Sequence, residues 1–125
     1  MIKAETITIS GNILIKKGQP HIMRIEVEKT RRAYEIACRC GLFCVPKVLD
    51  YDDSTGTAQF EFIHNLKTVR EVVSSGGNVD DIMHNTGRSL AVIHSQLGLP
   101  KDMISPLPQE YNCLEQKYFC MEIYV

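Results

Sequence analysis

The spacing of apolar residues changes period twice in the first half of the chain, and this change constrains the fold most. Over Thr6–Lys16 apolar residues fall on alternate positions around a Gly11-Asn12 turn, which is typical of a β-hairpin. Over Glu26–Cys40 they recur at the three- and four-residue steps of an amphipathic helix, which Gly41 is placed to end. Alternation returns after Val45. A helix flanked by antiparallel strands predicts an α+β fold in which the helix packs on one sheet face.

Further strands are expected on both sides of this helix. A short strand is predicted over His21–Ile25, with Pro20 tolerated because it precedes the strand proper. Two more are predicted over Val45–Tyr51 and Ala58–Ile63, joined by a turn rich in Asp, Ser, Thr and Gly. The sequence therefore predicts an antiparallel five-stranded sheet with one packed helix over residues 1–66.

Residues 67–125 are predicted to form a second, mainly helical unit with a poorly defined tail. Thr68 and Glu71 have the spacing of a capping box at the start of a short helix. Asn78 is placed to cap a second helix that carries an apolar stripe. The periodicity then decays, and we expect at most a short strand near Phe119–Tyr124.

Composition excludes several classes of partner. The 125 residues include 14 Lys and Arg against 15 Asp and Glu, so the net charge of −1 gives no one-sided field for nucleic acid or an anionic membrane. No apolar run approaches the roughly 18 residues that span a bilayer, and the first residues lack the features of a signal peptide. We therefore expect a cytoplasmic protein with no nucleic-acid or membrane partner.

The five cysteines are an odd number, so a disulfide framework would leave one thiol over. Three of them lie close together as Cys38, Cys40 and Cys44. Their C-x-C-x₃-C spacing fits poorly with the paired knuckles of structural zinc sites. Zinc binding and packing as small apolar residues are both open interpretations, and packing is favoured; we assign no metal ligand.

Five short motifs occur between His21 and His94 in an order that resembles one group of kinases. They are His21-Ile22-Met23-Arg24-Ile25, the charged helix, Val45-Pro46-Lys47-Val48-Leu49-Asp50, Phe60-Glu61-Phe62-Ile63 and Leu90-Ala91-Val92-Ile93-His94. In order and separation they are similar to the N-terminal part of the aminoglycoside phosphotransferase and choline kinase family. The resemblance implies a protein-kinase-like small lobe followed by the first helices of a truncated second lobe.

The resemblance also implies an ATP site with magnesium and gives roles to particular residues. Arg24 takes the position at which the family carries a basic residue for the nucleotide phosphates. Glu28 is the best-placed carboxylate to pair with it, ahead of Glu26 and Glu35. The strand that leads into the hinge implies adenine contacts from the backbone of four residues, Phe62, Ile63, His64 and Asn65.

Other groups that the family needs do not occur in this sequence. Phosphoryl transfer requires an aspartate beside the acceptor hydroxyl and further ligands for magnesium. No His-Gly-Asp followed by Asn occurs after His94. We therefore assign no catalytic residue and expect a partial or truncated phosphotransferase of a family that phosphorylates hydroxyls of small molecules.

Two alternatives remain open. A non-catalytic module could bind nucleotide, or a protein partner in place of the missing lobe, and would expose apolar surface around Phe43, Ile93 and Leu97. An unrelated small α+β domain would share the motif order by coincidence and would lack the five-stranded sheet with one packed helix.

Overall fold

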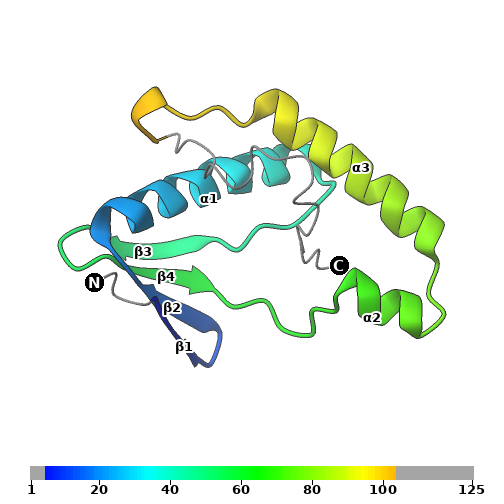
Figure 1. Cartoon of the computed structure of the whole chain (residues 1–125), viewed down its shortest axis with the longest axis horizontal. Coiled ribbons are helices and arrows are strands. Elements are labelled where there is room, and N and C mark those ends of the chain that lie inside the picture. The colour runs from blue at the N-terminus through cyan, green and yellow to red at the C-terminus, as the bar shows by residue number, and fades with distance from the viewer. Residues whose placement is uncertain (1–4, 104–125) are drawn as a thin grey trace, which may run out of the picture.

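The fold is α+β, as the sequence predicts, in a computed structural model that describes residues 5–103 (Figure 1). The expected strand near Phe119–Tyr124 lies outside these residues. The elements in chain order are strands β1 (Thr6–Ser10) and β2 (Ile13–Lys17), helix α1 (Pro20–Cys40), strands β3 (Val48–Asp52) and β4 (Thr57–Glu61), helices α2 (Val69–Ser74) and α3 (Val79–Gln96), and the short 3₁₀ helix η1 (Lys101–Met103).

The four strands of the described part form one antiparallel sheet in the order β1-β2-β4-β3. Helix α1 runs along one face over β3 and β4, whereas the β1–β2 hairpin extends beyond the helix (Figure 1). The connection between the two hairpins is therefore the helix itself, which crosses the sheet and returns the chain to its other edge.

The predicted strand at His21–Ile25 is wrong, because these residues form the first turns of α1. Pro20 is the first helical residue, a position that suits proline because its missing N–H would have no partner there. Met23 and Val27, four residues apart, are both almost completely buried. The sheet consequently has four strands over residues 5–103 instead of the expected five, a feature that favours an unrelated α+β domain.

The remaining local predictions are close to the structure. Gly41 ends α1 in the left-handed conformation with φ 66°, and its N–H donates to the Ala37 carbonyl at 2.9 Å. Both predicted hairpins are confirmed, although β3 begins at Val48, later than expected. Strand β4 ends at Glu61, and the N–H of the next residue, Phe62, continues the same register with the β1–β2 turn by donating to the Asn12 carbonyl at 2.8 Å.

The core lies between α1 and the sheet. Its buried members come from both layers and are Met23, Val27, Ala58 and Phe60, with Leu14, Val48 and Tyr51 packed against them. Burying one such side chain fully contributes about 1.5–3 kcal/mol. This small cluster therefore fixes the helix on the sheet.

Helices α2 and α3 have the predicted caps but contribute no buried residue. Thr68 and Glu71 form the reciprocal capping box, and the Asn78 side chain accepts from the Asp81 N–H at 3.3 Å. Phe43, Ile93 and Leu97 are half-buried, so the expected exposed patch is not centred on them. No helix within residues 5–103 has the length and apolar character needed to cross a membrane.

Candidate functional site

Lys16 lies on β2 and faces helix α1. Its cross-strand partner on β4 is Ala58, which is fully buried in the core. Leu14, two residues earlier, packs against the same core. Because alternate residues of a strand share a face and paired residues of neighbouring strands lie side by side, the Lys16 side chain extends into the space between sheet and helix.

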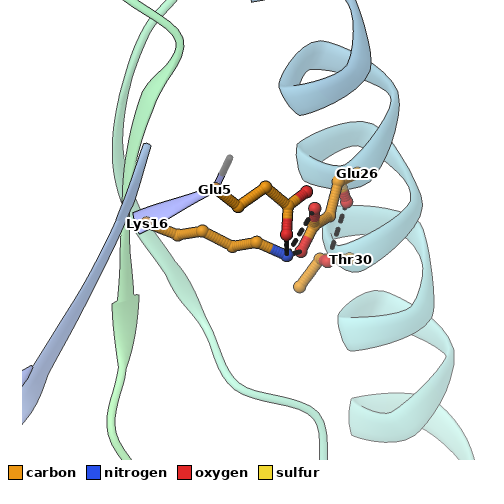
Figure 2. Close-up of polar contacts among 4 residues, drawn as sticks. All are labelled: Glu5, Lys16, Glu26 and Thr30. Atoms are coloured by element: carbon orange, nitrogen blue, oxygen red, sulfur yellow. Dashed lines mark hydrogen bonds and ion pairs between the residues drawn. The ribbon is translucent and has the colours of Figure 1, made fainter. Parts of the chain in front are cut away.

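Two carboxylates converge on the Lys16 ammonium (Figure 2). Its Nζ donates to both oxygens of Glu26, at 2.7 and 2.9 Å, and lies 3.3 Å from Oε2 of Glu5. Glu26 is on α1, and the hydroxyl of Thr30, one turn later, donates to its backbone carbonyl at 2.8 Å. The Lys16 side chain is 17% exposed, compared with 35% for Glu26. The ion pair therefore forms a partly buried bridge from sheet to helix.

The neighbouring carboxylates keep the lysine charged. Partial burial alone would lower the pKa of Lys16, but the hydrogen bonds and negative charges of Glu26 and Glu5 outweigh it, so that the pKa is raised from its ordinary value of 10.5. The site consequently holds a permanent cation at neutral pH.

Uncovered apolar surface lies beside this cation. Ile7 pairs with Lys16 across the β1–β2 hairpin, and Ile9 pairs with Leu14, so their side chains share the face on which Lys16 lies. Helix α1 does not reach over β1 (Figure 1), and the two isoleucines are 60% and 53% exposed. An ammonium next to an open apolar strip suits a ligand that combines an anionic group with an apolar ring.

The structure places the predicted phosphate-binding residues differently from the sequence interpretation. Arg24 is exposed on α1 and is not a strand residue. Glu28 accepts from Nε of Arg32 at 2.7 Å, one turn further along the helix. Glu26, which we ranked behind Glu28, is the carboxylate that joins the helix to the sheet.

The predicted hinge segment follows β4 and is tied to the β1–β2 turn. Phe62 donates its N–H to the Asn12 carbonyl at 2.8 Å, and Nε2 of His64 lies 2.9 Å from Oδ1 of the same asparagine. The Phe62 and His64 rings meet edge to face, with centroids 4.7 Å apart, and Asn65 has a positive φ of 60°. The Phe62 N–H is therefore already hydrogen-bonded within the chain. The prediction of backbone contacts to adenine then applies to the residues from Ile63 onward.

The described residues contain no cluster of metal-ligating side chains. Within residues 5–103 no group of three or more His, Cys, Asp or Glu side chains is arranged to hold a metal ion. Cys38, Cys40 and Cys44 are free thiols near the end of α1. No residue of this part of the chain is therefore assigned to the magnesium that the family resemblance implies.

No protein-family model, curated protein or solved structure matches the chain. The geometry around Lys16 is therefore the main indication of function in the described residues.

Lys16 is the residue that the sequence interpretation missed, although a signal for it was present. Ile13-Leu14-Ile15-Lys16 is itself a strand that ends in a lysine, with Leu14 and Lys16 on one face. Glu26 follows ten residues later, in the second turn of a helix that begins at Pro20. If the helix is taken to begin at Pro20, Arg24 becomes a helix residue, and Lys16 becomes the basic strand residue that precedes the helix.

Proposed function

We propose that this chain binds a nucleotide on the α1 face of its sheet and forms the small lobe of an ATP-dependent phosphotransferase. The proposed class phosphorylates hydroxyls of small molecules, like the aminoglycoside phosphotransferases that the sequence resembles. The observation that carries the proposal is the ion pair between Lys16 and Glu26. Kinases hold the phosphates of ATP with a strand lysine that a glutamate of the following helix positions.

The surroundings of Lys16 support a nucleotide over a simple anion. The open strip of Ile7 and Ile9 offers an apolar surface against which an adenine ring would lose contact with water. The turn residue Asn12, to which the hinge segment is tied, lies four residues from Lys16 along the chain, about 13 Å at the rise of a strand. That separation is comparable with the reach of a nucleoside triphosphate from its ring to its phosphates.

In this role, residues 5–103 bind and orient the nucleotide. Both oxygens of Glu26 accept from the Lys16 ammonium and hold it in one position. A positive charge that is already fixed in place is suited to binding phosphate. A sheet of four strands instead of five favours an unrelated α+β domain. The binding experiment must therefore distinguish such a domain from the small lobe of a phosphotransferase.

The test is isothermal titration of the full chain with ATP and magnesium, using wild type, Lys16→Met and Arg24→Ala. We expect binding in the micromolar to millimolar range that weakens about tenfold or more in Lys16→Met, because a charge-assisted contact to phosphate is lost. Arg24→Ala is the matched control, since it removes the same charge from an exposed position. We expect it to bind within about twofold of wild type.

Circular dichroism would confirm that each variant is folded before titration. Absence of binding by the folded wild-type chain would contradict the nucleotide site and favour the unrelated α+β domain. If Arg24→Ala loses affinity for ATP and Lys16→Met keeps it, the role of Lys16 is overturned and the phosphate-binding role returns to Arg24.

A further inference from the structure

Glu5 gives the Lys16 site a second carboxylate that the pairing with Glu26 does not require. It lies immediately before β1, and its Oε2 is 3.3 Å from Lys16 Nζ (Figure 2). One ammonium facing two carboxylates gives the group of three a net charge of −1. A site that receives phosphate is expected to have a positive charge available, so the extra carboxylate calls for an explanation.

The two carboxylates hold the ammonium with different strength. Glu26 uses both oxygens, at 2.7 and 2.9 Å, and belongs to a helix that Met23 and Val27 anchor in the core. Glu5 uses one oxygen at the longer distance, lies outside the strand and is 47% exposed. Because exposed ion pairs contribute little and screen readily, Glu5 is the partner that can leave Lys16 at low cost.

The Lys16 ammonium donates hydrogen bonds to both oxygens of Glu26 and forms an ion pair with Oε2 of Glu5. A phosphate oxygen that approached Lys16 would compete with Glu5 for the same positive charge. It would also carry the same sign of charge, so the carboxylate and the phosphate repel each other at contact distance.

We propose that Glu5 is a built-in competitor for the phosphate position, whose carboxylate occupies Lys16 until the phosphates of a nucleotide displace it. The inference rests on the proposed nucleotide site and adds a regulatory contact to it. Glu5 stands in for phosphate in the ligand-free chain and lowers the fraction of molecules in which Lys16 is available. The apparent dissociation constant rises by the reciprocal of that fraction.

The test compares binding of ATP with magnesium, and separately of inorganic tripolyphosphate, to wild type and Glu5→Gln by isothermal titration. Glutamine keeps the size of the side chain but removes the charge that competes. We expect Glu5→Gln to bind both probes about two- to fivefold more tightly, the range of an exposed ion pair expressed as a ratio of affinities. Adding Lys16→Met to Glu5→Gln should abolish the gain, because the competitor then has no target.

Glu35→Gln is the matched control for net charge. Glu35 is exposed on the same helix as Glu26 but nine residues further on, about 14 Å along the axis. We expect this variant to bind both probes as wild type does. An equal gain in Glu35→Gln and Glu5→Gln would show a general charge effect and overturn the competitor role.

The outcomes separate this inference from the proposed function. Unchanged or weaker binding in Glu5→Gln, with Lys16-dependent binding in wild type, overturns the competitor role and leaves the nucleotide site in place. Lys16-dependent binding in wild type that becomes tighter in Glu5→Gln supports both. No binding by any folded variant overturns both.

Discussion

Gly56 shows at the scale of a single residue how the backbone fixes the contact between the β3–β4 turn and the start of α1. Its φ is +68°, and a Cβ at this position would lie 2.2 Å from the Gly18 carbonyl oxygen and 3.1 Å from the Pro20 nitrogen. The Gly18 N–H also donates to the Gly56 carbonyl at 3.0 Å. The turn therefore presses directly on the segment that leads from β2 into the helix.

Gly56→Ala should consequently destabilise the chain by about 2–4 kcal/mol, from left-handed strain together with overpacking against backbone that cannot move aside. Urea denaturation monitored by circular dichroism measures the change in the free energy of unfolding. Gly11→Ala is the matched control, with φ +59° and no atom within 4 Å of the added Cβ, and should lose only about 1 kcal/mol. Equal losses at the two positions would mean that the turn does not contact Gly18.

The site could be predicted only in part at this scale, because its polar contacts join distant residues. The motif order pointed to a strand cation, a helix carboxylate and a hinge segment after β4, and the structure has a strand lysine paired with a helix glutamate. The sequence interpretation assigned these roles to Arg24 and Glu28. Choosing between Glu26 and Glu28 requires knowing which helix face meets β2, and that is decided by the burial of Met23 and Val27 and not by the charges themselves.

At the scale of elements, features with local causes were predicted well and the one with a non-local cause was not. Hairpin turns and caps depend on residues within a few positions, and both hairpins, the capping box at Thr68 and the stop at Gly41 are confirmed. His21–Ile25 is short and partly apolar, so its periodicity fits a strand or a helix. Its helical state is stabilised by packing on Ala58 and Phe60, which lie more than thirty residues away in the sequence.

A contact from the other side of the core holds the same helix start. The Tyr51 hydroxyl on β3 lies 3.1 Å from the Pro20 carbonyl oxygen and 2.7 Å from the Asp53 carboxylate. Partial burial, followed by the hydrogen bond to Asp53, raises the pKa of Tyr51 to about 12. The first turn of α1 is therefore attached to the sheet through polar as well as apolar contacts.

The helical state of this segment predicts which of two neighbouring apolar residues matters. Met23→Ala should cost about 2–5 kcal/mol, because Met23 is fully buried and its removal leaves a cavity between α1 and β4. Ile22→Ala should cost less than about 1 kcal/mol, since Ile22 is 42% exposed on another side of the helix. Thermal or urea unfolding of the two variants measures the difference. A larger loss for Ile22→Ala would contradict the helix assignment.

At the scale of the whole molecule, the described chain consists of a packed layer pair and a more loosely attached pair of helices. The layer pair is the sheet with α1, which contains every buried apolar side chain of residues 5–103. Helix α3 lies beside α1 (Figure 1) and is joined to this part by few polar contacts: Arg32 donates to the Gly98 carbonyl, and the Ser89 hydroxyl donates to the Leu42 carbonyl at 3.3 Å.

This division predicts two levels of stability within one chain. Helix α3 itself contributes no buried side chain, whereas β4 contributes Ala58 and Phe60, so the amides of α3 should exchange with solvent through a smaller free-energy opening than those of β4. Native-state hydrogen exchange measures both sets of amides in one experiment. Ile93→Ala should lower protection in α3 while changing β4 by less than about 0.5 kcal/mol, and Phe60→Ala should lower both, by about 3–5 kcal/mol in β4. If α3 and β4 instead show equal protection and respond equally to Ile93→Ala, the two parts unfold as one unit. The lysine site would then depend on α3, although it is built entirely from Glu5, β2 and α1.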